Sequence, residues 1–303
     1  MRGWYPRTRG KLLTKTLIGS GGGHGKAAIL VHFGTDAPNG HGTVQISVVC
    51  YRPVMPATPA WPPASTPRLF VDQPLASGAT ITVEGAAAHY LLNVMRLKIG
   101  APILLFDNRS GEWLATVADA GRRALTLDVG RQTRVIEQVP DLWLCFAPVK
   151  KARLDWIIEK ATELGTARLQ PVITDRTIVE RVKRERLEAQ IVEACEQCGR
   201  TTLPVLGEPV KLAQLLADWP GGRTLLFADE AGGSSLASVA AAAPAAILTG
   251  PEGGFTDRER AVLTDHPAVR RIALGPRILR AETAAIAAIS LWMGQHGDWQ
   301  TAR

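Results

Sequence analysis

The chain beyond residue 140 alternates short apolar runs with stretches in which apolar residues recur every three or four positions. The short runs, which have the length of buried strands, are 142–148, 169–173 and 223–228. The periodic stretches, which have the spacing of helices, are 151–164 and 184–198. Gly165 follows the first of them and is expected to end it. This alternation predicts an α/β domain over residues 140–300 with a mostly parallel sheet flanked by helices.

Two further apolar runs lie near the C-terminus, and each ends in a glycine-proline turn. Residues 246–249 lead into the turn 250–254, and residues 271–274 lead into the turn 275–276. Glycine tolerates positive φ and proline fixes its own φ, so both turns can bend sharply and expose backbone N–H and C=O groups. Two strand ends that open into glycine loops predict a ligand cleft at the edge of the sheet.

Two helices are predicted within this closing stretch. The spacing of Thr256 and Glu259 is that of a capping box, which starts a helix after the first turn. Residues 284–293 are apolar on nearly every side, which predicts a helix that is either deeply buried in its own chain or covered by a partner. Both interpretations remain open at the level of the sequence.

Residues 68–136 show a different pattern, in which short β-like runs are separated by Gly, Asn and Ser turns. These runs are RLFV, ATITV, PILLF, EWLATVAD and RALTLDV. Several such runs at close spacing predict a small β-barrel. An inserted stretch, 86–96, has the pattern of a helix that would bring His89, Asn93 and Arg96 near one another.

Residues 1–67 differ from the rest in composition and predict a disordered or dispensable extension. They hold seven Lys/Arg and a single acid, so they carry +6 of the net charge of +7. The remaining chain is close to neutral, which makes its overall basicity weak evidence for a nucleic-acid partner. Residues 28–51 favour strands, and Met55 is a possible internal start. Residues 19–27 imitate a phosphate-binding loop but lack its first Gly and the hydroxyl residue that reaches Mg²⁺.

The four cysteines, Cys50, Cys145, Cys195 and Cys198, form no evident disulfide framework, which fits a reducing, cytoplasmic location. Only Cys195 and Cys198 have metal-like spacing, and no second Cys/His pair lies nearby. We therefore expect no metal site. No apolar run reaches the roughly 18 residues that a membrane helix needs. Lys15 interrupts the early apolar run, whereas a signal peptide needs an unbroken one.

The motifs GPEGGF at 250–255 and LGPRILRAETA at 274–284 together resemble the signature of the SPOUT methyltransferases, specifically of the family that methylates N3 of a uridine in 16S ribosomal RNA. LDWIIEKATELG at 154–165 also resembles this family, and the resemblance covers residues 68 to about 292. It implies a PUA-like RNA-binding barrel over 68–136 and a C-terminal trefoil knot that holds S-adenosylmethionine. Knots are rare, and nothing in the periodicity of the chain shows one. A homodimer whose clefts are completed by the second subunit is implied as well.

The resemblance places the cofactor against the two glycine-proline loops. The residues it assigns there are Leu248, Thr249, Gly250, Pro251, Glu252, Gly253, Leu274, Gly275, Ile278, Leu279, Arg280, Glu282 and Thr283. Arg280 is the expected catalytic residue, because a guanidinium can hold a phosphate or stabilise a uracil oxyanion. Glu282 either orients Arg280 or favours the start of the following helix, and the second, structural role is preferred.

His89, Arg96 and Arg200 are the expected RNA contacts, and 16S ribosomal RNA or the small ribosomal subunit is the implied partner. His89 could equally be a packed core residue, and Arg96 could equally be an ordinary surface residue, so these alternatives stay open. Three activities are weighed. The favoured one is methylation of uridine N3 in 16S RNA, the second is methylation of another RNA such as tRNA, and the third is RNA binding without catalysis. The intact pair of loop motifs disfavours the third.

Overall fold

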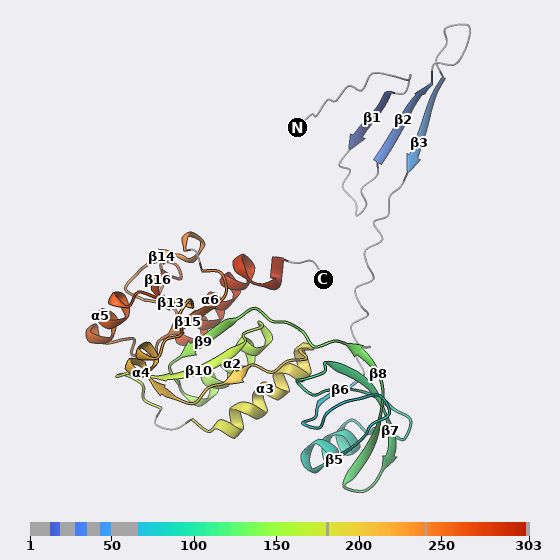
Figure 1. Cartoon of the computed structure of the whole chain (residues 1–303), viewed down its shortest axis with the longest axis horizontal. Coiled ribbons are helices and arrows are strands. Elements are labelled where there is room, and N and C mark those ends of the chain that lie inside the picture. Colours follow the sequence, from blue (N-terminus) through green and yellow to red (C-terminus); the bar gives the residue numbers. More distant parts are fainter. Residues whose placement is uncertain are drawn as a thin grey trace. The chain divides into compact units, whose positions relative to one another are not determined.

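The computed structural model of the chain divides into two units, residues 1–64 and 65–303, and it describes residues 13–18, 28–34, 43–49, 66–179, 182–239 and 241–300. In the first unit, three strands form an antiparallel sheet in the order β1-β2-β3 (Figure 1). They are β1 (Leu13–Ile18), β2 (Ala28–Gly34) and β3 (Thr43–Val49). The last two lie in the range for which the sequence favours strands. The loop 19–27, Cys50 and Met55 lie outside the described residues.

The first part of the second unit, which we call the barrel domain, is a five-stranded sheet in the order β4-β6-β7-β8-β5 (Figure 1). Its strands are β4 (Arg68–Phe70), β5 (Thr80–Glu84), β6 (Pro102–Phe106), β7 (Glu112–Ala120) and β8 (Ala124–Arg134). The β4–β6 pair is parallel and the others are antiparallel. Alternate side chains point inward, as at Ile81 and Val83, and build a separate core. The predicted small barrel is present as this sheet.

The helical insertion of the barrel domain ends earlier than predicted. Helix α1 (Gly85–His89) continues into a π-helical turn, η1 (Tyr90–Val94), in which the N–H of Met95 donates to the carbonyl of Tyr90 at 2.9 Å. Arg96 lies beyond this turn with a φ of 54°. A π turn takes more residues than an α turn. Arg96 therefore lies outside the helical segment that carries His89 and Asn93.

The rest of the second unit, which we call the C-terminal domain, contains an eight-stranded sheet in the order β11-β10-β9-β15-β13-β16-β14, with β12 paired to β10. Its strands are β9 (Leu142–Phe146), β10 (Arg168–Ile173), β11 (Val205–Leu206), β12 (Val210–Lys211), β13 (Thr224–Ala228), β14 (Ser234–Ser235), β15 (Ala245–Thr249) and β16 (Val269–Ala273). Every pairing in it is parallel. The mostly parallel α/β sheet predicted from the alternation is thereby confirmed, whereas the threading that would make a knot stays a prediction.

Helices cover both faces of this sheet (Figure 1). The helical elements are α2 (Lys151–Glu163), α3 (Arg184–Cys198), α4 (Leu212–Ala217), η2 (Leu236–Ser238), α5 (Asp257–Asp265), α6 (Ala281–His296) and η3 (Asp298–Gln300). Leu144 and Ile247 face a core that α2, α3 and α6 complete, whereas their neighbours Cys145 and Leu248 face a second core with α4 and α5. Strands buried on both faces need apolar residues at every position. This requirement explains the continuous apolar runs of the sequence.

The predicted helix boundaries in the C-terminal domain agree closely with the structure. Gly165 follows α2 with a φ of 91°, and Thr256 caps α5 through a capping box with Glu259. Helix α6 buries Ile289 and Trp292 within its own chain, while Leu291 on the same helix is exposed. The described residues contain no helix that combines the length and the apolar character needed to cross a bilayer.

Candidate functional site

Two loops that follow β15 and β16 define one edge of the C-terminal sheet. Both strands pair with β13 in parallel, so their carboxyl ends reach the same edge with a single strand between them. Neighbouring strands are about 4.8 Å apart, which separates the starts of the two loops by about 10 Å. Ligands of open parallel sheets bind outside the carboxyl ends of the strands. The two glycine-proline turns therefore lie where one small ligand can contact both.

The glycines of these loops are required by the fold itself. A Cβ on Gly250 would lie 2.6 Å from Cε2 of Phe255, whose ring packs edge-on against Phe227 at a centroid distance of 4.9 Å. Gly275 has a φ of 104°, a conformation that strains other residues. A Cβ on Gly275 would meet nothing within 4 Å, so the space beside its Cα is open.

The residues expected to bind the cofactor differ in how they can do so. Leu248 and Thr249 end β15 as fully buried residues, and the carbonyl of Thr249 already accepts the N–H of Ala147 at 3.0 Å. Gly275 and Thr283 are exposed, and the side chain of Ile278 is 85% exposed. The remaining members, which lie in or directly beside the two loops, are Gly250, Pro251, Glu252, Gly253, Leu274, Leu279, Arg280 and Glu282.

Arg153 joins the two loops, although the sequence motifs did not single it out. It lies in the first turn of α2, which follows β9, and β9 pairs with β15. Its Nη1 is 3.2 Å from Oε1 of Glu252 in the first loop, and its Nε is 3.5 Å from Oε1 of Glu282 beyond the second. The role of Arg153 could have been predicted only from the strand order, because the β9–β15 pairing brings α2 to this edge.

Glu282 contacts Arg153 and not Arg280. The Arg280 side chain is exposed and makes no hydrogen bond or ion pair with any described residue, and its carbonyl accepts the N–H of Ala284 at 2.8 Å. The structure therefore gives Glu282 no role in orienting Arg280. Glu282 lies in the first turn of α6, where a carboxylate is favourable, although no side chain caps this helix through a hydrogen bond.

A third loop, which follows β13, is held by charged contacts. Asp229 is buried just after β13 and accepts hydrogen bonds from Nε of Arg271, at 2.9 Å, and from Arg260 of α5. Arg260 also pairs with Glu230. Burial lowers the pKa of Arg260, but Glu230 and Asp229 outweigh it and leave the pKa raised. These pairs fix the loop between the two strands that carry the glycine-proline turns.

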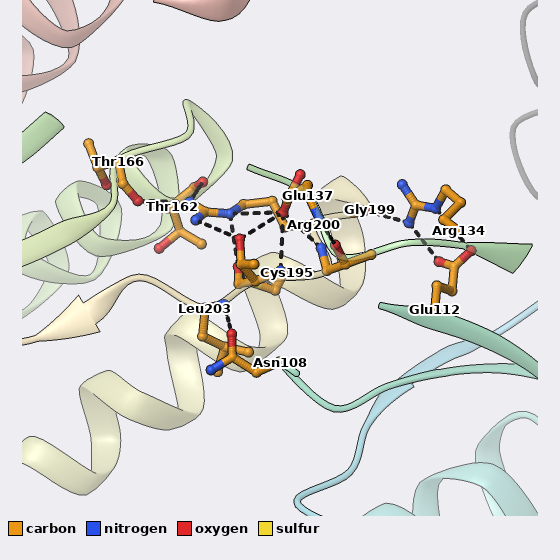
Figure 2. Close-up of polar contacts among 12 residues, drawn as sticks. Asn108, Glu112, Arg134, Glu137, Thr162, Thr166, Cys195, Gly199, Arg200 and Leu203 are labelled. Atoms are coloured by element: carbon orange, nitrogen blue, oxygen red, sulfur yellow. Dashed lines mark hydrogen bonds and ion pairs between the residues drawn. The ribbon is translucent and has the colours of Figure 1, made fainter. Parts of the chain in front are cut away.

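The expected RNA contact Arg200 is buried inside the protein, with 5% of its surface exposed. Figure 2 shows its guanidinium pointing toward Thr162 and Thr166 at the end of α2. Its Nη1 donates to the carbonyls of these residues at 2.8 and 3.0 Å, and its Nε donates to the carbonyl of Thr202 at 3.0 Å. We interpret Arg200 as a structural residue for this reason, and it is not carried into the proposed RNA surface.

The barrel domain reaches the last turn of α3 through two arginines. Nη1 of Arg68 donates to the carbonyl of Cys195 at 2.6 Å. Nη2 of Arg134 donates to that of Gly199, also at 2.6 Å (Figure 2). Helix C-termini carry partial negative charge, which favours such cations. Buried Glu112 pairs with both arginines, at 2.8 and 2.7 Å. Burial raises the pKa of Glu112, but Arg134 and Arg68 outweigh burial and hold it below its ordinary value.

The two cysteines of α3 differ in burial, since Cys195 is buried and Cys198 is half-buried. Cys195 is buried, its Sγ lies 3.6 Å from the carbonyl of Thr202, and burial raises its pKa to about 12. Burial also raises the pKa of Cys198. Protonated thiols are poor metal ligands. Within the described residues, no three His, Cys, Asp or Glu side chains are grouped so that they could hold a metal ion.

His89 and Arg96 of the barrel domain both lie at the protein surface. The interpretation of His89 as a packed core residue is therefore wrong. Three large apolar side chains beside them, Tyr90, Val94 and Ile99, are also exposed. Exposed apolar and cationic groups on one short segment are typical of a contact surface.

Comparisons with known proteins agree with this two-part organisation. The sequence profile of an RNA methyltransferase domain matches residues 137–293, and that of an RNA methyltransferase PUA domain matches residues 83–130. Ribosomal RNA small subunit methyltransferase E of Rickettsia conorii is 32% identical over 229 residues, which cover 74% of this chain and 93% of the relative. The protein of the same name from a Synechocystis species is 33% identical over 233 residues, 74% of this chain and 76% of the relative.

Two solved structures are similar to the chain as well. Ribosomal RNA small subunit methyltransferase E from Neisseria gonorrhoeae, bound to S-adenosyl methionine, is 27% identical with a TM-score of 0.72, covering 77% of this chain and 99% of that one. A putative methyltransferase from Legionella pneumophila, in complex with the same cofactor, is 29% identical with a TM-score of 0.72 and equal coverage. These similarities confirm the predicted SPOUT-like fold class with a PUA-like domain before it.

Proposed function

Because this chain belongs to the RNA methyltransferase family, we propose that it transfers a methyl group from S-adenosylmethionine to N3 of a uridine in 16S ribosomal RNA. The observation that carries the proposal is the meeting of both glycine-proline loops at one sheet edge, beside the exposed Arg280. Relatives named for the small-subunit ribosomal RNA support this class of substrate. The choice of uridine N3 rests on the resemblance of the two loop motifs.

The residues at the edge fit such a cofactor. Exposed backbone at Gly275, with open space beside its Cα, offers N–H and C=O groups to an adenine and a ribose, whereas the carbonyl of Gly253 already accepts a hydrogen bond from Arg176 at 2.7 Å. The cofactor, when bound, supplies a sulfonium methyl group as its own electrophile. The protein therefore has to bind and orient the two reactants. In this proposal the exposed Arg280 stabilises the negative charge that develops on a uracil oxygen as N3 loses its proton.

We propose that the active form is a homodimer in the cytoplasm. Three large apolar side chains, Trp156 of α2, Ile278 of the second loop and Leu291 of α6, are exposed. Exposed apolar residues of this size are typical of interaction surfaces. Burial of Ile289 and Trp292 shows that α6 is covered on one side by its own chain, so the partner would cover only the side that carries Leu291.

Nucleoside mapping tests the proposed reaction. In cells that lack the gene, 16S RNA is expected to lose one methyl group at N3 of a uridine, and the purified protein with S-adenosylmethionine is expected to restore it. A methyl group missing instead from tRNA would favour the second activity. Unchanged modification of both RNAs would favour RNA binding without catalysis.

Residues 1–54 are expected to be unnecessary for methylation. Sequence similarity to the family starts near Arg68, and the first unit of the structure is separate from the one that carries both loops. A chain that starts at Met55 should methylate the RNA at the rate of the full chain, measured by transfer of a labelled methyl group. A loss of activity in a folded sample would give the first unit a part in the reaction.

Replacement of the exposed Arg96 by alanine is expected to weaken RNA binding. Removal of one phosphate contact lowers the dependence of log K on log salt by about one unit. Filter binding at several salt concentrations measures this slope, and cofactor affinity should stay unchanged. Arg109→Ala is the control, because Arg109 is an exposed arginine of the same domain that pairs with Asp72. Equal slopes in the Arg96→Ala variant and in the unmodified protein would show that Arg96 makes no phosphate contact and that RNA binds to another part of the surface.

A further inference from the structure

The carboxylate of Glu282 has one oxygen without a partner. Glu282 is 9% exposed, and its Oε1 lies 3.5 Å from Nε of Arg153. Its Oε2 is buried and has no hydrogen-bond partner among the described residues. Buried polar atoms are nearly always paired, because an unpaired one loses its interaction with water and gains nothing in return. An unpaired carboxylate oxygen in a native fold therefore calls for a hydrogen-bond donor or a cation.

Glu282 lies at the point where the two glycine-proline loops come together. It is the second residue of α6, which directly follows the second loop. Arg153, its neighbour, reaches Glu252 of the first loop with Nη1 while its Nε faces Glu282. The guanidinium of Arg153 thus connects Glu252 in the first loop with Glu282 after the second. The unpaired Oε2 of Glu282 is part of the carboxylate that this guanidinium contacts.

The charge of this group selects the kind of donor. Two carboxylates, Glu252 and Glu282, share the one positive charge of Arg153, which leaves a net charge of −1. An ionised carboxylate oxygen only accepts hydrogen bonds. A phosphate or carboxylate of a ligand would be repelled, whereas a cationic group would complete the pairing.

From these contacts we propose that Oε2 of Glu282 binds a cationic group of S-adenosylmethionine, and that Arg153 is the positioning residue that holds this carboxylate between the two loops. The inference rests on the proposed function. The cofactor has two cationic centres, its sulfonium and its α-ammonium group. Its demethylated product, S-adenosylhomocysteine, keeps the ammonium group and lacks the sulfonium charge. A comparison of the affinities for the two molecules therefore shows which of the two cationic centres Glu282 binds.

Calorimetric titration of the full chain with both molecules is the test. Glu282→Gln keeps the size of the side chain and removes its charge. This variant is expected to bind S-adenosylmethionine with an affinity lower by about tenfold or more, as for a lost hydrogen bond to a charged group. If the sulfonium is bound, S-adenosylhomocysteine affinity stays unchanged. If the ammonium is bound, both affinities fall equally. Unchanged affinity for both molecules would overturn the proposal.

Arg153 is tested through a double-mutant cycle. If Arg153 acts by positioning Glu282, Arg153→Ala lowers the affinity for the cofactor when Glu282 is present. The same substitution has little further effect on that affinity in the Glu282→Gln variant. Independent, additive losses would contradict a positioning role. Arg184→Ala is the matched control, because Arg184 has 38% side-chain exposure against 34% for Arg153 and also pairs with two glutamates. Cofactor affinity of this control should equal that of the unmodified protein.

The outcomes separate this inference from the proposed function. An unmodified chain that binds neither molecule would refute the proposed cofactor itself. An unmodified chain that binds both, with a Glu282→Gln variant that binds them equally well, would refute only the role of Glu282. If Glu282→Gln fails to fold, Arg153→Ala alone decides, since a partly exposed arginine can be removed without disturbing the core. Full affinity in that folded variant would then overturn the proposal.

Discussion

Replacement of Arg280 by alanine is expected to lower the turnover of RNA methylation by about 10²-fold or more, the usual loss when one preorganised electrostatic donor is removed. The side chain is exposed, follows the second glycine-proline loop and makes no hydrogen bond or ion pair with another described residue. Its guanidinium is thus free to bind the substrate. Single-turnover measurements with saturating cofactor report the chemical step directly.

Affinity for S-adenosylmethionine and the midpoint of thermal unfolding should change little in the Arg280→Ala variant, because the side chain is exposed and no hydrogen bond or ion pair with a described residue is lost. Arg258→Ala is the control, since Arg258 is an exposed arginine of α5 just beyond the first loop. Its turnover should remain close to that of the unmodified chain. If Arg280→Ala instead unfolds the C-terminal domain, Arg280 is structural and another group acts on the uridine.

Replacement of Arg200 by methionine is expected to lower the free energy of unfolding by about 3–5 kcal/mol, as when one partner of a buried polar network is removed. Three carbonyl groups, those of Thr162, Thr166 and Thr202, would each lose a hydrogen bond from the guanidinium. For a domain of this size the loss corresponds to a fall in Tm of about 6–20 °C. Denaturant titration measures the free energy, and differential scanning calorimetry measures Tm.

The same variant decides between the two roles considered for Arg200. A structural residue leaves the salt dependence of RNA binding unchanged at temperatures where the variant is folded. Arg122→Met, which alters an exposed arginine of the β7–β8 turn, should change the free energy of unfolding by at most about 0.5 kcal/mol. An Arg200→Met variant of full stability with a weaker salt dependence would restore Arg200 as an RNA contact.

The parts of the fold that were predictable from the sequence are those set by local spacing. Helix α3 has the predicted bounds, and the capping box of Thr256 and Glu259 is present. Both depend on residues a few positions apart. The inserted helix of the barrel domain was less predictable, because the π-helical turn at Tyr90–Val94 changes the number of residues per turn.

The contacts at the candidate site depend on the order of the strands, which periodicity does not contain. Arg153 and Glu252 are 99 residues apart in the chain, and they meet because β9 pairs with β15. Arg200 was misjudged for a related reason. Gly199 ends α3 with a φ of 84°, and this turn directs the chain that follows back toward α2. The polarity of an arginine indicates a water-exposed position, but backbone carbonyls can replace water.

The contacts of Arg68, Arg134 and Glu112 with α3 have a consequence for the modularity of the protein. Many two-domain enzymes can be cut at a linker, because few contacts cross it. Here the carbonyls of Cys195 and Gly199 receive hydrogen bonds from the barrel domain, and both arginines depend on one buried acid. The two domains should therefore unfold as one cooperative unit. A barrel grafted from another protein would serve only if it brought two arginines and an acid to the same end of α3.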